Sequence, residues 1–198
     1  DYILTVAISM AAGTDAVFSN LPANWVHWKL PATILLSGVL IWLNMRGLKE
    51  SIKVLLPIFL VFVATHLLLI VWGVGSHTAQ LPDIVLGAVE ESKDMITDKG
   101  LFAFMALLLT AYSLGGGTYT GIEAVANGMN TLAEPKVKTG KRTMLYMALS
   151  LAFTAAGILF CYMLFHIHHE PGKTMNASLI YEMFKNWPMS GAIISRSE

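Results

Sequence analysis

Two apolar runs meet at Ser113-Leu-Gly-Gly-Gly-Thr-Tyr-Thr-Gly121, and a single acid, Glu123, follows two residues later. Each glycine inside a helix costs about 1 kcal/mol relative to alanine, so three in succession disfavour a regular helix. In lipid, the backbone groups freed by such a break need protein or a water-filled site as their partner. A broken apolar helix beside an ionisable group is typical of a transporter binding site. The sequence therefore predicts a solute site at residues 113–121.

Composition indicates a protein whose solvent is the lipid bilayer. The 198 residues are 55% hydrophobic and 13% charged, whereas soluble domains average about 25% charged residues. Thirteen basic and thirteen acidic residues cancel, so no basic surface suggests a nucleic acid partner. The single cysteine, Cys161, excludes an internal disulfide and cannot hold a structural zinc ion alone. Because the first residue lies inside an apolar run and no signal peptide precedes it, we expect a fragment of a longer protein.

Five apolar runs approach or exceed the length that crosses about 30 Å of hydrocarbon. They cover residues 1–19, 31–46, 52–74, 101–132 with an interruption at 113–121, and 143–166. Two further stretches, 82–97 and 178–184, have the mixed apolar and polar faces of short surface helices. The sequence therefore predicts an all-α polytopic membrane protein, with one transmembrane domain over residues 1–198.

Basic residues concentrate in two short connections, 46–53 and 134–143, which lie on the same side of the membrane if the five spans alternate. These 18 residues hold seven of the 13 lysines and arginines. The positive-inside rule assigns this side to the cytoplasm. We therefore expect a multi-pass protein of the plasma membrane with both connections in the cytoplasm.

Three carboxylates fall inside apolar runs: Asp1, Asp15 and Glu123. A charge at the bilayer centre costs roughly 2.5–3.5 kcal/mol on insertion scales, so each needs a partner or a function. Asp15 is close enough to the end of its run to reach the interface, and Asp1 is compatible with a surface position. Glu123 lies where the broken helix resumes, and a helix N-terminus favours its negative charge. It is compatible with coupling to protons and with a structural hydrogen bond.

Oxygen-bearing side chains accompany the break. Asp1, Tyr2 and Thr5 share one helix face, since positions four apart stack one turn above each other. Carboxylate, hydroxyl and unwound carbonyl oxygens suit a dehydrated alkali cation, and they equally suit the ammonium group of an amino acid. The predicted substrate-binding residues are Asp1, Tyr2, Thr5, Gly115, Gly116, Gly117, Thr118, Thr120 and Gly121, with Glu123 as the proton-coupling residue.

Other patterns favour structural interpretations. Gly115–Gly117 lacks the preceding strand and the following Gly-Lys-Ser/Thr of a phosphate-binding loop. Gly117-x-x-x-Gly121 fits close helix packing, which is compatible with a nearby site. His166-Ile-His168-His169 favours an interfacial position over metal binding, and His66 favours a hydrogen bond to a neighbour. Because no catalytic constellation is present, we expect neither an enzyme nor a cofactor.

The residues after the break resemble a transporter family. Thr120-Gly-Ile-Glu-Ala-Val-Ala-Asn-Gly-Met-Asn-Thr-Leu-Ala-Glu-Pro135 resembles the sixth transmembrane helix and following loop of permeases of the amino acid–polyamine–organocation (APC) superfamily. Arg46-Gly-Leu-Lys-Glu-Ser51 is similar to its turn between the fourth and fifth helices, and 1–9 to the third helix of one branch. Residues 172–177 resemble the outer loop after the seventh helix. The resemblance spans nearly the whole chain and implies helices three to seven of the five-plus-five inverted-repeat (LeuT-like) fold.

Within this superfamily the chain resembles the KUP-like bacterial potassium–proton symporters. Their potassium sites use a third-helix Asp with a Thr one turn later, and a sixth-helix Thr three residues before a Glu. These positions correspond to Asp1, Thr5, Thr120 and Glu123. The resemblance therefore implies that the first three bind potassium and that Glu123 is linked to the proton. The triple glycine departs from the superfamily pattern, in which aromatic residues are common at this position.

Together these features predict a secondary transporter that imports a small solute by proton-coupled alternating access. Potassium–proton symport is the first hypothesis. Proton-coupled import of an amino acid held by the backbone of residues 115–121 is the second, and a non-transporting membrane scaffold or receptor is the third. The expected partners are potassium or an amino acid, protons and the lipid bilayer, without nucleic acid. Association into a homodimer is left open.

Overall fold

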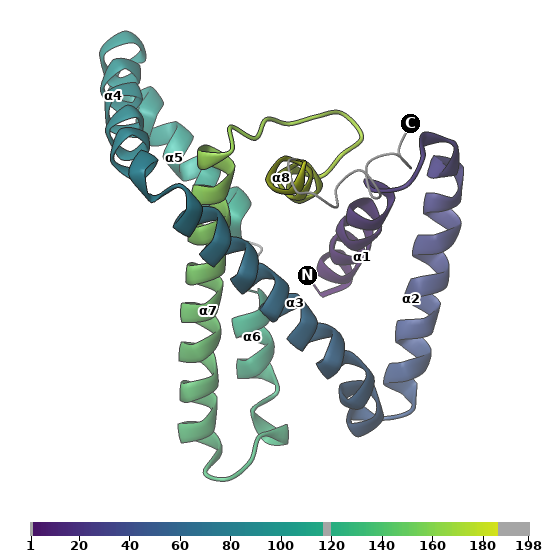
Figure 1. Ribbon diagram of the computed structural model, residues 1–198. Helices are drawn as coiled ribbons and strands as arrows, with labels where there is room; N and C mark the ends of the chain where they lie inside the picture. The colour runs from purple at the N-terminus through teal and green to yellow at the C-terminus, as the bar shows by residue number, and fades with distance from the viewer. Residues whose placement is uncertain (1, 117–119, 186–198) are drawn as a thin grey trace. The chain divides into compact units, whose positions relative to one another are not determined.

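The computed structural model describes residues 2–116 and 120–185 (Figure 1). Within these residues the secondary structure is helical and contains no strand, which confirms the all-α prediction. The chain divides into two compact units, one of residues 1–76 with 160–198 and the other of residues 77–159.

The first unit contains the first three α-helices of the chain and the last described one. They are α1 (Tyr2–Phe18), α2 (Lys29–Met45), α3 (Leu48–Ser76) and α8 (Met175–Phe184), with the 3-10 segment η1 (Ala23–Trp28) before α2. α1 contacts α2, and α2 contacts α3 near the Arg46-Gly47 turn. The last residues of α7, 160–164, also belong to this unit.

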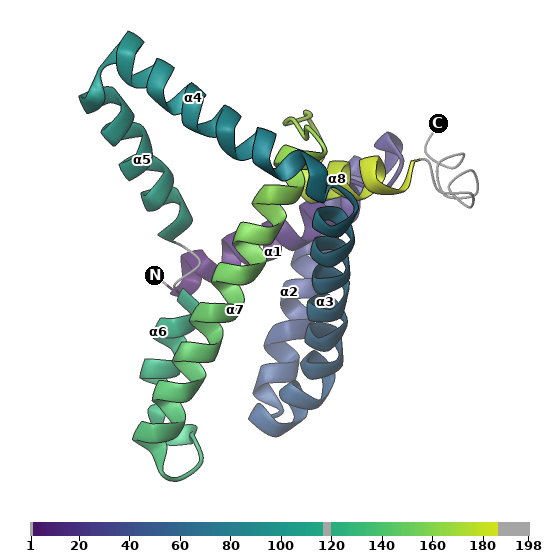
Figure 2. The same ribbon diagram turned by 60° about the vertical axis from the view of Figure 1, so that its left-hand side comes forward.

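The second unit contains the interrupted helix and the helix that follows it. Its elements are η2 (Thr78–Gln80), α4 (Leu81–Lys99), α5 (Leu101–Gly115), α6 (Thr120–Asn127), η4 (Met129–Thr131) and α7 (Lys136–Leu164). α4 and α5 meet at the Gly100 turn (Figure 2). α6 lies beside α7 in both views (Figures 1 and 2).

Within residues 2–116 and 120–185, three helical segments are long and apolar enough to cross a membrane. They are Ala23–Met45, Ser51–Ser76 and Lys136–Leu164, while the apolar segments Ile3–Phe18 and Leu101–Gly115 are shorter. Only 6% of the most apolar part of the Ser51–Ser76 segment is buried within the chain. Such exposure of aliphatic side chains is expected where lipid replaces water around a helix. By length and composition, therefore, this is a helical membrane protein.

Helix bounds differ from the predicted runs where basic residues extend a helix. α3 begins at Leu48 instead of residue 52, and α7 begins at Lys136 instead of residue 143. The predicted runs begin only after the charged residues. Lysine and arginine nevertheless have good helix propensity, so the helix and its backbone hydrogen bonds already include them. The connection predicted at 46–53 is therefore only Arg46-Gly47, and most of 134–143 forms the first turns of α7. The helices predicted within 82–97 and 178–184 are confirmed as α4 and α8.

The turn between α2 and α3 depends on one glycine. Gly47 has φ +112°, a conformation that strains any residue with a Cβ atom. After the turn, the Ser51 hydroxyl donates to Asn44 Oδ1 at 3.0 Å. The Arg46 guanidinium lies 4.1 Å from the centroid of the Trp42 ring. These local contacts allow the two apolar helices to reverse direction within two residues.

Candidate functional site

The predicted break lies between two helices of the second unit. α5 ends at Gly115 and α6 begins at Thr120, and both bounds fall inside residues 113–121. Gly116 caps α5 with φ −59° and ψ −25°. A Cβ atom added at Gly115 or Gly116 would meet no described atom within 4 Å, so close packing does not account for these two glycines. The site residues Gly117 and Thr118 lie outside the described residues.

The two helix ends at the break have opposite electrostatic character. The C-terminal end of a helix such as α5 carries partial negative charge, which favours a cation. The first amide groups of α6 carry partial positive charge, which favours an anion. Glu123 supplies an anion, because it lies in the first turn of α6 and its side chain is exposed. Thr120 begins the same helix, and its side chain is outside the described part of the chain.

Gly121 lies where α6 approaches α7. A Cβ atom at Gly121 would lie 3.0 Å from Met147 Cε, and one at Gly140 would lie 3.3 Å from Leu132 Cδ1. Glycine at these positions lets α6 and the following segment approach the backbone of α7. The helix packing considered for Gly121 is therefore present, and it fixes the start of α6 against a long apolar helix.

The other half of the predicted site belongs to α1 in the first unit. Tyr2 begins α1 and Thr5 is half-buried in its first turn. Asp1 and the side chain of Tyr2 lie outside the described residues. The structure therefore describes the helix that carries Thr5 and the helix that carries Glu123 separately, and a shared ligand set remains a prediction.

Asp15, the acid of α1, has a structural partner. It forms an ion pair with Lys29 at the start of α2, and both side chains are about two-fifths exposed, at 43% and 42%. One residue earlier, the hydroxyl oxygens of Thr14 and Thr33 lie 3.0 Å apart. These contacts join α1 to α2, which supports the structural interpretation of Asp15.

His66 has a hydrogen-bonding partner in the described chain. His66 Nδ1 lies 2.9 Å from the carbonyl oxygen of Phe62, one turn earlier in α3, in agreement with its predicted hydrogen bond to a neighbour. The described residues contain no group of three or more His, Cys, Asp or Glu side chains that could hold a metal ion.

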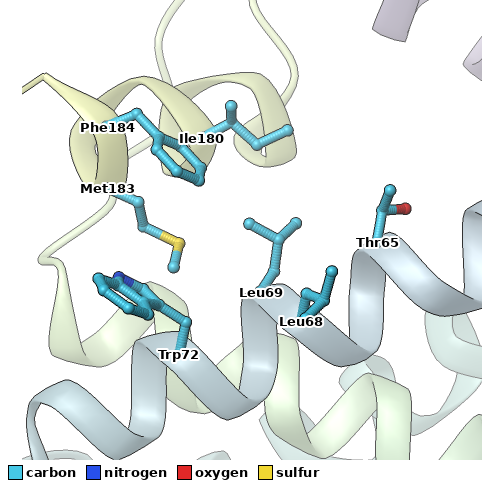
Figure 3. A pocket seen from close by; sticks show the side chains of 7 residues that line it. All are labelled: Thr65, Leu68, Leu69, Trp72, Ile180, Met183 and Phe184. Carbon is cyan, nitrogen blue, oxygen red and sulfur yellow. The ribbon is translucent and has the colours of Figure 1, made fainter. Parts of the chain in front are cut away.

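An apolar pocket of about 360 Å³ lies between α3 and α8 and is not predicted from the sequence (Figure 3). Its lining residues are Thr65, Leu68, Leu69, Trp72, Ile180, Met183 and Phe184. The spacing of the last three on α8 is that of one helix face, and this pattern indicates that α8 packs against another element. It does not indicate which helix forms the opposite wall.

Comparison with curated proteins gives one informative relative. The chain is 35% identical over 186 residues to the potassium transporter KimA of Bacillus subtilis (strain 168). The alignment covers 93% of this chain and 29% of that protein, so the chain spans less than a third of the length of its relative. No protein-family model and no solved structure matches. The chain is thus related, over nearly all of its residues, to a part of a potassium transporter.

Proposed function

We propose that the protein containing this chain is a secondary transporter that takes up potassium together with protons. The observation that carries this proposal is the similarity to a potassium transporter along 93% of the chain. Three helical segments of membrane-spanning length and composition support it. The proposal includes the APC-type five-plus-five fold, a plasma membrane location, and a cytoplasmic position for residues 46–53 and 134–143.

Potassium binding is assigned to oxygen atoms from α1 and from the break. Asp1, Thr5 and Thr120 supply a carboxylate and two hydroxyl groups, which replace the water molecules lost when the ion is dehydrated. Carbonyl groups at the C-terminal end of α5 add negative partial charge without another acid. The contributing backbone and neighbouring side chains are those of Tyr2, Gly115, Gly116, Gly117, Thr118 and Gly121.

Glu123 is assigned to proton coupling. Its carboxyl group lies in the first turn of α6, next to the break, and its side chain is exposed. In the proposed transport cycle this carboxyl group takes up one proton on one side of the membrane and releases it on the other side with each ion.

Uptake by the full-length protein in liposomes tests the proposed function directly. Rubidium, which replaces potassium as a tracer, is expected to accumulate when the pH outside is lower than the pH inside. A protonophore is expected to abolish this accumulation, and labelled amino acids should not enter. The oxygen groups at the break also fit an ammonium group, so entry of an amino acid without rubidium would favour the permease hypothesis. Entry of neither would favour a scaffold and contradict the proposal.

Replacing Glu123 by Gln separates proton coupling from ion binding. Gln retains the size of the side chain but cannot carry a proton, so Glu123→Gln is expected to lose accumulation driven by a pH gradient. Exchange of rubidium across the membrane at equal pH should persist. Glu134→Gln is the matched control, because Glu134 is an exposed side chain that lies 3.7 Å from Lys136 Nζ in the connection to α7. Accumulation by Glu123→Gln at the rate of the unaltered protein would remove Glu123 from the coupling step.

A further inference from the structure

We propose that the pocket between α3 and α8 binds one acyl chain of a membrane phospholipid. Its walls come from two helices of the first unit, and Figure 3 shows Leu69 and Trp72 of α3 opposite Met183 and Phe184 of α8. The volume of about 360 Å³ is within the range of small-molecule sites. The proposal is independent of which solute the protein carries.

The chemistry of the lining favours hydrocarbon. Among the residues that the structure describes, no charged side chain lines the pocket. The hydroxyl of Thr65 lies 2.9 Å from the carbonyl oxygens of both Val61 and Phe62 in its own helix, so its one proton is donated within that helix. A polar solute would lose its water without gaining partners on these walls. An acyl chain gives up no hydrogen bond on leaving the bilayer, and it exchanges its dispersion contacts with other lipids for dispersion contacts with the walls of the pocket.

The depth of the pocket along α3 matches one leaflet. The apolar segment of this helix ends at Ser76. With a rise of 1.5 Å per residue, Trp72 lies about 6 Å and Thr65 about 16 Å from that end along the axis. Half of the hydrocarbon core is about 15 Å thick. The pocket therefore extends from the interface, where tryptophan is favoured, toward the bilayer centre, which is the path of one acyl chain.

The second wall is held in place by contacts outside the pocket. Thr174 caps α8, and its Oγ1 accepts a hydrogen bond from the amide of Ala177 at 3.3 Å. The hydroxyl of Tyr162 donates to Asn176 Oδ1 at 2.6 Å and ties α8 to the end of α7. Leu179 of α8 is fully buried. With α8 anchored in this way, the pocket is a built feature of the unit.

Photolabelling of the full-length protein in liposomes tests the proposal. The probe is phosphatidylcholine with a diazirine on one acyl chain, and mass spectrometry locates the adducts. Adducts at Leu68, Leu69 and Ile180 are expected to saturate at a low fraction of probe. Val71 is the matched position, because it lies on α3 with 60% of its surface exposed and does not line the pocket. Its labelling should rise in proportion to the probe.

Two variants that fill the pocket provide the second readout. Leu69→Trp and Ile180→Trp, placed on opposite walls, are each expected to reduce pocket labelling severalfold and to leave Val71 labelling unchanged. If pocket labelling rises in proportion to the probe, as at Val71, the lipid contact is only that of an ordinary surface and the proposal is wrong. If Val71 is labelled and the pocket is not, another part of the protein occupies the pocket, which also overturns the proposal. Saturation of labelling in the unaltered protein tests the proposal even if both variants fail to fold.

Discussion

Asp1→Asn in the full-length protein is expected to weaken rubidium uptake by about 10- to 100-fold at low rubidium concentration. A contact to a charged group contributes about 1.5–3 kcal/mol, and each 1.4 kcal/mol is a tenfold change in affinity. Asn retains the shape and one oxygen ligand of the side chain but removes the charge that balances a dehydrated cation. The effect should therefore be a higher KM for rubidium, measured from initial rates of uptake over a range of rubidium concentrations.

Asp15→Asn is the matched control within the same apolar run. Asp15 lies near the C-terminal end of α1 and pairs with Lys29 at the start of α2, and both side chains are partly exposed. Exposed ion pairs contribute at most about 1 kcal/mol to stability, so this variant should fold and transport with an almost unchanged KM. An equal loss of uptake in both variants would indicate damage to α1 and not to an ion site.

Thr120→Ala tests the site from the second unit. Loss of a neutral hydroxyl ligand reduces the binding free energy by about 0.5–1.5 kcal/mol. A few-fold to tenfold increase in the KM for rubidium is therefore expected. The effect should be smaller than that of Asp1→Asn. If rubidium uptake survives both substitutions unchanged, the assignment of these residues to the potassium site is wrong.

The local features of this fold could be predicted from the sequence. Three adjacent glycines disfavour a helix whatever surrounds them, and the helix bounds at Gly115 and Thr120 fall in that region. The short helices α4 and α8 are predicted from the periodicity of their apolar residues alone. The starts of α3 and α7 are not predicted correctly. The length of an apolar run indicates only the part of a helix that lies in hydrocarbon, and the helix itself continues beyond that part. Lys136 is helical although it lies outside the predicted run.

Long-range contacts could not be predicted, and the reason is specific to a membrane solvent. In a soluble helix, an apolar stripe marks the face that packs against protein. α3 is apolar on all sides, so Leu69, which lines the pocket, and Val71, which does not, are indistinguishable in the sequence. The partner helix is also distant along the chain. The candidate site has the same limitation, since spacing within α1 or α6 places residues on a helix but does not bring two helices together.

Gly73→Ala is expected to destabilise the first unit, where α3, α7 and α8 meet. A Cβ atom at Gly73 would lie 2.8 Å from Cys161 Sγ and 3.3 Å from Met183 Cε. Met183 can move its terminal methyl group, but Cys161 is short and has 0% of its surface exposed. Overpacking of this kind costs about 1–3 kcal/mol, of which the better helix propensity of alanine offsets up to about 1 kcal/mol. The measurement is the midpoint of thermal unfolding in detergent.

Gly75→Ala is the control two residues away on α3. A Cβ atom at Gly75 meets no described atom within 4 Å, so this variant gains helix propensity without a clash and should unfold at the same temperature or higher.

The clash at Gly73 also predicts a rescue, because Cys161→Ala removes the Sγ atom that the new methyl group would meet. In the Gly73→Ala, Cys161→Ala double variant, the two effects should be less than additive, as expected for residues in contact. Additive effects, or a Gly73→Ala protein as stable as Gly75→Ala, would show that α3 and α7 do not approach at this point.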